Sequence, residues 1–194
     1  MSHPVLQVIA ASTRPGRKGI AVARWIQRQA EAHGAFDVEL VDLAEVGLPV
    51  FDEPNHPRLQ QYTHQHTRDW SATVDRADAF VFVTPEYNHS LPGSLKNALD
   101  FLHTEWADKA AGIVSYGGVS AGLRAATALK PVLASLRVVP VVEAVSIPFF
   151  AQFLDEDDEF VPNAELEAGG KAMLDALVRL TGALRPLRAA EPAA

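Results

Sequence analysis

The sequence predicts a three-layer α/β/α fold in which a parallel sheet is covered by helices on both faces. Short, almost continuously apolar segments alternate five times with longer segments of helical periodicity, and this is the pattern of parallel strands joined by helices. A hydrophobic content of 48% in 194 residues supplies the core of one domain. We therefore expect a single domain over residues 1–185, followed by a flexible tail at residues 186–194.

The first half of the chain contains three predicted strands, which cover residues 5–10, 36–41 and 79–83. Their apolar runs are too short for helices and rich in β-branched and aromatic residues. The first helix is expected from about Gly19 to His33, because Gly34 supplies a stop signal. Residues 47–62 are rich in proline and polar groups and form a long connection before a helix over roughly 63–76.

The second half continues the same alternation, with strands over residues 110–115 and 138–147. Its helices are expected over about 94–103, after the glycine-rich segment 117–122, and over about 164–180. Pro131 lies inside the middle one of these helices and predicts a kink there, because proline lacks the N–H that a helix interior needs.

Composition and charge exclude several classes of function. The chain has no cysteine, so disulfides, cysteine metal sites and thiol catalysis are excluded. A net charge of −7 argues against nucleic acid as a partner, although the acidic run Asp155–Glu159, expected to be a solvated surface loop, carries much of it. No apolar run approaches ~18 residues and the N-terminus lacks the basic lead of a signal peptide, so we expect a cytoplasmic protein with no membrane partner.

The loop between the first strand and the first helix has the composition of a phosphate site. Residues 11–19 offer two hydroxyls, three cations and two glycines before a helix N-terminus, whose free N–H groups favour anions. The loop matches neither Gly-x-x-x-x-Gly-Lys-Ser/Thr nor Gly-x-Gly-x-x-Gly. Three cations suit a mononucleotide better than a metal-bound triphosphate. The alternative is an ordinary capped turn that carries surface cations.

A second candidate segment, Thr84–Asn97, follows the third strand. Pro85 and Pro92 stiffen it, and it carries a carboxylate, an aromatic ring and an amide in succession. Open α/β sheets bind their ligands beyond the carboxyl ends of their strands. The segment therefore predicts one wall of a ligand site.

The third candidate segment, Gly118–Gly122, matches the Gly-x-Ser-x-Gly pattern of hydrolase nucleophiles. That triad requires a histidine after the serine, and all seven histidines precede Ser120. The hydrolase interpretation therefore fails. The paired glycines Gly117 and Gly118 instead suit a close approach of bare backbone to a flat ligand.

Two further pairs of residues are candidate sites. On the predicted helix His64 and His66 diverge, and no further ligand completes a metal site, so we expect surface histidines and no bound metal. Lys96 and Asp100 stand at i and i+4 on one helix. They can pair within the chain or across a subunit contact, and the sequence leaves both open.

Taken together, these segments resemble the NADPH-dependent FMN reductase family of flavodoxin-like enzymes. The matching motifs, spread over residues 5 to about 147, are Ser12-Thr13-Arg14 with Arg17 and Lys18, the run Thr84–Asn88, the run Pro92–Asp100, and Ser115–Gly118. The resemblance implies a five-stranded parallel sheet in the order 2-1-3-4-5, with FMN bound at its carboxyl edge.

The resemblance also implies which residues hold the cofactor. Ser12 and Arg14 would bind the FMN phosphate, with Lys18, Gly19 and Ile20 nearby. The isoalloxazine ring would lie along Pro85, Glu86, Tyr87 and Asn88, and its pyrimidine side would meet the segment made of Ser115, Tyr116, Gly117 and Gly118. No side chain is expected to be catalytic, since the flavin N5 takes the hydride.

The activity implied by the resemblance is an NAD(P)H oxidoreductase that works by a ping-pong cycle, with NADPH or NADH as co-substrate. Electrons would pass through bound FMN to a small acceptor such as a flavin, a quinone, an azo compound or chromate. A non-enzymatic FMN-binding redox sensor or electron carrier is the alternative. Relatives of this kind associate as homodimers or homotetramers, in which Lys96 and Asp100 would be interface contacts.

Overall fold

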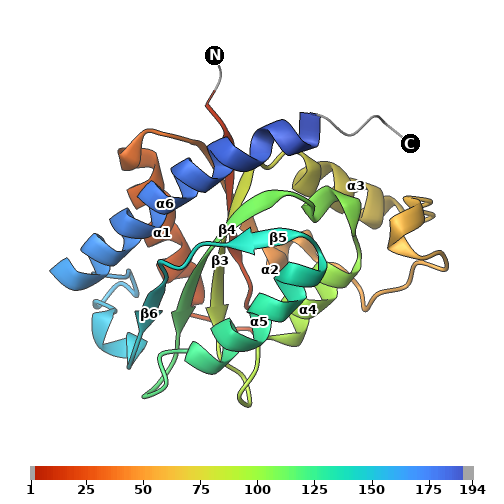
Figure 1. Ribbon diagram of the computed structural model, residues 1–194. Helices are drawn as coiled ribbons and strands as arrows, with labels where there is room; N and C mark the ends of the chain where they lie inside the picture. Colours follow the sequence, from red (N-terminus) through yellow and green to blue (C-terminus); the bar gives the residue numbers. More distant parts are fainter. Residues whose placement is uncertain (1–2, 190–194) are drawn as a thin grey trace.

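The computed structural model describes residues 3–189 and contains one parallel sheet with helices on both faces (Figure 1). The strands follow the order β2-β1-β3-β4-β5, and β6 also pairs with β4. Their bounds are Val5–Ala10 for β1, Asp37–Asp42 for β2, Ala79–Pro85 for β3, Lys109–Tyr116 for β4, Val138–Pro140 for β5 and Val145–Ile147 for β6. The predicted fold class and strand order are confirmed.

Within residues 3–189, six α-helices and three short 3-10 helices connect or follow these strands. The α-helices are α1 (Gly19–His33), α2 (Leu43–Val46), α3 (Gln65–Asp75), α4 (Gly93–Asp100), α5 (Leu123–Ser135) and α6 (Ala164–Ala189), and the 3-10 helices are η1 (Pro57–Leu59), η2 (Thr104–Trp106) and η3 (Phe150–Phe153). Within the described residues, no helix combines the length and the apolar character needed to cross a membrane.

The sheet separates two hydrophobic cores, and β3 contributes to both. Ala79, Val81 and Val83 pack on the side of α1 and α6, whereas Phe80 and Phe82 pack on the side of α3, α4 and α5. This division follows from the period of two along a strand, which sends alternate side chains to opposite faces. All seven residues of β3 are buried, so the strand that carries the predicted ligand segment at its end is fixed in the centre of the molecule.

The prediction of one continuous fifth strand over residues 138–147 is wrong. The structure has two three-residue strands, β5 and β6, that pair with opposite ends of β4. Pro140 explains the break, because a proline cannot donate a ladder hydrogen bond and is confined to strand edges and ends. The intervening residues are largely exposed, with Val142 91% exposed.

The last helix is longer than the sequence predicted. α6 continues through Pro186 to Ala189, where a tail was expected to begin. Arg188 fixes this end by donating to the carbonyl of Ala77 at 3.0 Å and by pairing with Asp78. The part of the predicted tail at residues 190–194 lies outside the described residues. In α5, Pro131 lies within a helix that is continuous to Ser135.

Candidate functional site

A cavity of about 450 Å³ opens at the carboxyl edge of the sheet. The parallel register aligns the ends of the central strands there, with Pro85 of β3 opposite Tyr116 of β4. The cavity is lined by residues at or after the ends of β1, β3, β4 and β6, namely Ser12, Arg14, Arg17, Lys18, Gly19, Pro85, Glu86, Tyr87, Tyr116, Gly117, Gly118, Phe149, Phe150, Ala151 and Gln152. The three segments singled out in the sequence therefore meet at one place.

The N-terminus of α1 faces this cavity without a capping side chain. Lys18 is the N-cap residue, and its side chain makes no capping hydrogen bond. The first N–H groups of a helix have no acceptor inside it. In α1 the N–H of Ala21 donates to the Lys18 carbonyl at 3.1 Å, whereas those of Gly19 and Ile20 have no backbone acceptor among the described residues. An uncapped helix N-terminus of this kind favours an anion.

The three cations of the loop before α1 have different partners. Arg17 pairs with Asp42 at 2.5 Å, and Lys18 pairs with Asp158 of the acidic loop. Among residues 3–189, no carboxylate lies within ion-pair distance of Arg14, whose side chain is exposed and lines the cavity. Arg14 is therefore the cation of this loop that remains available to a ligand.

Two tyrosines form the polar wall beside the loop. The hydroxyls of Ser12 and Tyr87 share a hydrogen bond of 2.7 Å. Tyr116 is 5% exposed, and its hydroxyl fills the space above Gly19, where a Cβ atom would lie only 1.8 Å from it. Burial raises the pKa of the Tyr116 phenol, so this group stays protonated at neutral pH and able to donate a hydrogen bond.

Glu86 connects the two loops that flank the cavity. Its carboxylate accepts hydrogen bonds from the Ser120 hydroxyl and the Arg124 amide, both at 3.1 Å, and pairs with the Arg124 guanidinium. The Arg124 side chain is the largest cause of the lowered pKa of Glu86. The Glu86 side chain is only 7% exposed. Ser120 is thus a partner of Glu86, in agreement with the failure of the hydrolase interpretation.

A fourth segment, which the sequence did not predict as part of the site, closes the cavity next to the glycines. The N–H groups of Phe149 and Phe150 donate to Gly118 and Gly117 at 3.0 and 3.1 Å, and the N–H of Gly117 donates to Ile147 at 3.2 Å. The Phe150 ring packs on Tyr116 with centroids 5.0 Å apart. Phe149, Phe150, Ala151 and Gln152 were missed because the predicted continuous strand over 138–147 gave no reason to bring them here.

Three predicted site residues do not line the cavity. Ser115 is buried, and its hydroxyl donates to the Ala121 carbonyl at 2.9 Å, which supports the glycine-rich loop from below. Asn88 is exposed at the tip of a turn in which Tyr87 and Ser90 exchange backbone hydrogen bonds. The side chain of Ile20 packs against the core on the α1 face of the sheet.

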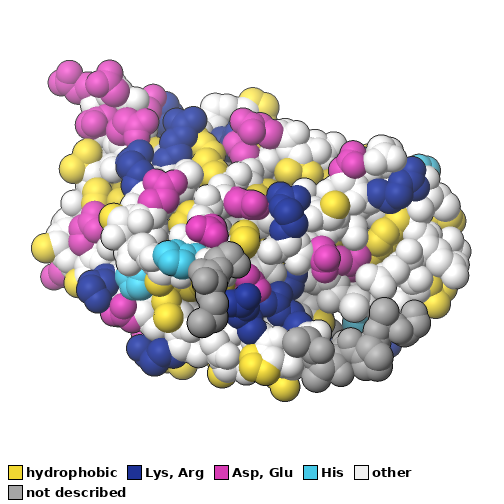
Figure 2. All heavy atoms as spheres, turned by 90° about the horizontal axis from the view of Figure 1, so that it is seen from above, with side chains coloured by type: hydrophobic (Ala, Val, Ile, Leu, Met, Phe, Trp, Pro, Cys, Tyr) yellow, Lys and Arg dark blue, Asp and Glu magenta, His cyan; other side chains and the backbone are white. Residues whose placement is uncertain are grey.

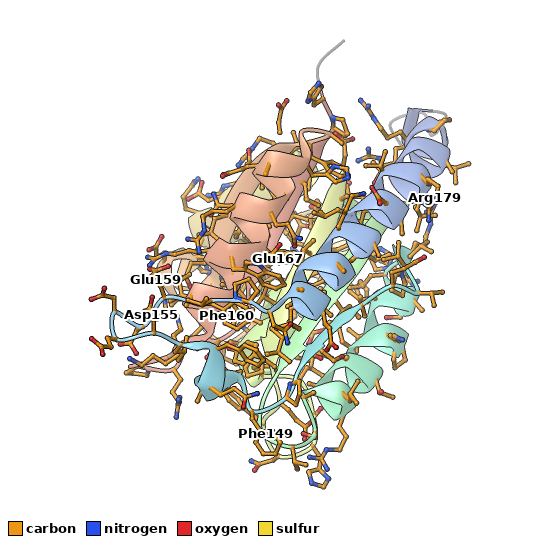
Figure 3. All side chains as sticks on the ribbon, turned by 90° about the vertical axis from the view of Figure 1, so that its left-hand side faces the viewer. Phe149, Asp155, Glu159, Phe160, Glu167 and Arg179 are labelled. Atoms are coloured by element: carbon orange, nitrogen blue, oxygen red, sulfur yellow. The ribbon has the colours of Figure 1, made fainter. Side chains whose placement is uncertain are left out.

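The acidic loop Asp155–Glu159 lies against α1 rather than free in solvent. Asp158 pairs with Lys18, and Glu159 lies 3.8 Å from Arg24 and 3.5 Å from Arg28. Figure 3 shows the segment running from Phe149 at the carboxyl edge to Asp155 and Glu159 beside the helix. The loop is therefore held by cations of the same chain.

The two remaining sequence candidates are resolved as contacts within the chain. The rings of His64 and His66 stack at 5.1 Å instead of diverging, because His64 lies at the N-cap of α3, outside the helix. Across residues 3–189, no cluster of three ligand side chains could hold a metal. The Lys96 ammonium donates to both oxygens of Asp100 at 2.8 and 2.7 Å, so these residues pair with each other.

Comparisons with known proteins agree with this geometry. The profile of the family described as NADPH-dependent FMN reductase matches residues 5–152. An NAD(P)H-dependent FMN reductase of Schizosaccharomyces pombe is 42% identical over 149 residues, which cover 75% of this chain and 74% of the relative. A protein of the same description from Saccharomyces cerevisiae is 33% identical, covering 77% and 84%.

The fold is also found in solved structures. FerB, a flavoenzyme NAD(P)H:(acceptor) oxidoreductase from Paracoccus denitrificans, superposes with a TM-score of 0.74 at 22% identity, over 93% of this chain and 98% of its own.

Proposed function

The chain belongs to the NADPH-dependent FMN reductase family, and from this we propose where and how it acts. A member of this family is an oxidoreductase that uses FMN with NAD(P)H. The cavity at the carboxyl edge holds the FMN, and electrons pass from NAD(P)H to a small acceptor in a ping-pong cycle. The observation that carries this proposal is the uncapped N-terminus of α1 beside Arg14, the loop cation without an ion-pair partner among the described residues.

The residues present fit FMN in their chemistry. A phosphate dianion matches the free N–H groups of the first turn of α1, the Ser12 hydroxyl and the Arg14 guanidinium. A flat ring system matches the walls formed by Pro85, Tyr87 and the glycine pair. We propose that Lys18 acts at longer range, since its ammonium already pairs with Asp158.

Binding, orientation and hydrogen bonding are the tasks left to the protein. The bound FMN supplies the redox chemistry, because its N5 atom can take a hydride. The N–H of Gly118 has no backbone acceptor among the described residues, so it can donate to the pyrimidine edge of the ring. Gly117 cannot, because its N–H is bonded to Ile147. A donor fixed before the ring gains negative charge stabilises that charge without reorganisation.

An open mouth allows NAD(P)H and the acceptor to use the same surface in turn. Tyr87 and Phe149 line the cavity and are 37% and 56% exposed. The carboxylate of Glu86 beside the cavity is engaged with Ser120 and Arg124, so it is not free to act as a general base. We propose that the acceptor is a small molecule such as a flavin, a quinone or an azo compound.

We further propose that the chain acts as a homodimer or homotetramer, with α4 at the contact. Lys96 and Asp100 keep 46% and 44% of their side chains exposed while they pair with each other, so either can exchange its partner for one on a second copy. Light scattering of the purified protein and of the Asp100→Lys variant tests this. A monomeric wild type, or an unchanged oligomer in the variant, would contradict the assignment of these two residues.

An absorbance spectrum of the purified protein, followed by NAD(P)H oxidation with a panel of acceptors, tests the activity. We expect a yellow protein, or one that takes up added FMN, that oxidises NADPH or NADH when a quinone is present. A protein that cannot bind FMN would contradict the site assignment. A protein that binds FMN but consumes no NAD(P)H would be a redox carrier or sensor.

A further inference from the structure

Phe149 adopts an unfavourable backbone conformation at the mouth of the cavity. Its φ and ψ angles are 46° and 45°, in the left-handed region that residues with a Cβ rarely adopt. Its ring is 56% exposed, so core packing does not compensate. A strained residue that is held at a ligand site is a reason to look for a role in function.

The surrounding backbone holds this conformation in place. The N–H of Phe149 donates to Gly118 at 3.0 Å, and its carbonyl accepts from Gln152 at 2.9 Å. The neighbouring Phe150 packs on Tyr116. One phenylalanine of the pair therefore completes the wall, while the other stands exposed at the rim (Figure 3).

The lining of the cavity combines two kinds of side chain. Arg14, Arg17 and Lys18 supply cations, whereas Pro85, Tyr87 and Phe149 supply rings. Tyr87 and Phe149 are the exposed rings of this lining, at 37% and 56%. The mouth thus offers a planar molecule a surface on which to stack.

We propose that Phe149 determines which electron acceptors this site prefers, by giving a planar aromatic acceptor a ring to stack against. The proposal rests on the proposed function, since it assumes that reduced FMN is exposed beneath the mouth. Aromatic rings gain from offset or edge contacts beyond the area they bury. A compact acceptor such as ferricyanide has no face that could use this contact.

The test compares two acceptors in variants of the FMN-loaded protein. Phe149→Ala removes the ring, Phe149→Leu keeps an apolar side chain without a ring, and Phe149→Tyr keeps the ring. Val161→Ala is the matched control, because Val161 is also 56% exposed on the same segment but does not line the cavity. Steady-state rates are measured with a neutral naphthoquinone and with ferricyanide, and FMN affinity is measured by fluorescence titration.

For Phe149→Ala we expect the KM for the naphthoquinone to rise about tenfold, in line with loss of an aromatic contact, and a smaller rise for Phe149→Leu. Phe149→Tyr and Val161→Ala should stay within about twofold of wild type. In Phe149→Ala and Phe149→Leu the KM for ferricyanide should change much less than the KM for the naphthoquinone, and the FMN titration of each variant separates a lost acceptor contact from lost cofactor. An unchanged naphthoquinone KM in Phe149→Ala and Phe149→Leu, or an equal loss with both acceptors, overturns the proposal.

Failure of the proposed function gives a different result. A wild-type protein that takes up no FMN, or oxidises no NAD(P)H, contradicts the function and the role of Phe149 together. A wild type that turns over both acceptors, with Phe149 variants that do the same at unchanged KM, contradicts the role of Phe149 alone.

Discussion

The two edges of the sheet use charged groups in opposite ways. At the amino edge, Lys109 is 2% exposed and donates to the carbonyls of Val74 and Asp75 at 2.8 and 3.1 Å. At the same edge, the Asp78 carboxylate accepts from the N–H of Val5 and pairs with Arg188. Charges of both signs are interspersed on the face seen in Figure 2, where the strands begin. At the carboxyl edge, Arg14 and the N-terminus of α1 have no such partners among residues 3–189.

The helix ends show the same contrast. Carboxylate or amide oxygens of Glu53, Glu86 and Asn163 accept from N–H groups at the start of α3, α5 and α6, and Lys109 covers the C-terminal carbonyls of α3. The N-terminus of α1 is left open. The N-cap residue of α4, Pro92, also makes no side-chain capping bond. What sets the open end of α1 apart is its place beside Arg14 and the cavity, where an anionic ligand can accept from it.

The contrast predicts its largest effect at Arg14. Arg14→Ala should raise the FMN dissociation constant about 30- to 150-fold, since a charge-assisted bond to phosphate is worth roughly 2–3 kcal/mol. Folding should be unaffected, because the side chain is exposed. Arg24→Ala, which removes a cation of α1 that pairs with Glu159, is the control. Equal FMN affinity in the two variants would contradict the proposal that Arg14 at the carboxyl edge of the sheet binds the phosphate of FMN.

At the amino edge of the sheet, we expect Lys109 to make the free energy of unfolding depend on pH. Burial lowers the pKa of Lys109 from 10.5 to about 8, so between these values the unfolded chain binds more protons than the folded one. Stability therefore rises with pH in this window, by on the order of 2 kcal/mol between pH 8 and 10. Urea unfolding of Lys109→Met should lack this rise, with FMN affinity unchanged. A rise in stability of the same size in the variant would contradict the attribution of this pH dependence to Lys109.

A substitution of Glu86 tests whether FMN binding at the carboxyl edge also depends on the contacts of Glu86 with Ser120 and Arg124. Glu86→Gln weakens the tie between the two loops, and we expect a loss of about 1 kcal/mol in unfolding free energy and an FMN dissociation constant about fivefold higher. Because the folded pKa of Glu86 is lowered, its stabilisation is present above the ordinary value of 4.5 and disappears as the pH falls below the folded pKa.

The control for this variant is Glu143→Gln, whose partner Arg179 lies at 3.8 Å in an exposed pair. Such surface pairs contribute little to stability. If both variants lose the same stability and neither changes FMN affinity, then Glu86 is an ordinary ion-pair residue and does not shape the site.

The smallest effect is expected at Ser120. Its hydroxyl is one of several donors to Glu86, so Ser120→Ala should retain kcat/KM within about twofold. Steady-state oxidation of NAD(P)H checks this. Complete loss of turnover while FMN stays bound would point to a nucleophile at Ser120 and count against flavin chemistry.

The elements that the sequence predicted best are governed by local signals. The predicted bounds of β1 and α1 agree with the structure because an apolar run, interrupted only by Gln7, defines the strand and Gly34, at φ 73°, ends the helix. The segments after β1, β3 and β4 could be assigned to one site because parallel strands end at a common edge.

What the sequence could not predict depends on contacts between distant residues. The ion pair of Lys18 was not predicted, because its partner Asp158 lies 140 positions away. Phe149 reaches the cavity because β6 pairs with the end of β4 and aligns Ile147 with Tyr116. Neither pairing leaves a periodic or compositional signal near the residues that it positions.

The contact between Gly19 and Tyr116 links two sequence positions that are almost a hundred residues apart. A Cβ atom at position 19 would lie 1.8 Å from the tyrosine hydroxyl and 2.4 Å from the ring carbon that bears it, so removing the hydroxyl alone does not make room. The two positions must therefore change together. Among relatives that keep this backbone, we expect alanine at the first position only where the second carries a side chain shorter than an aromatic ring, a covariation that an alignment of the family can test.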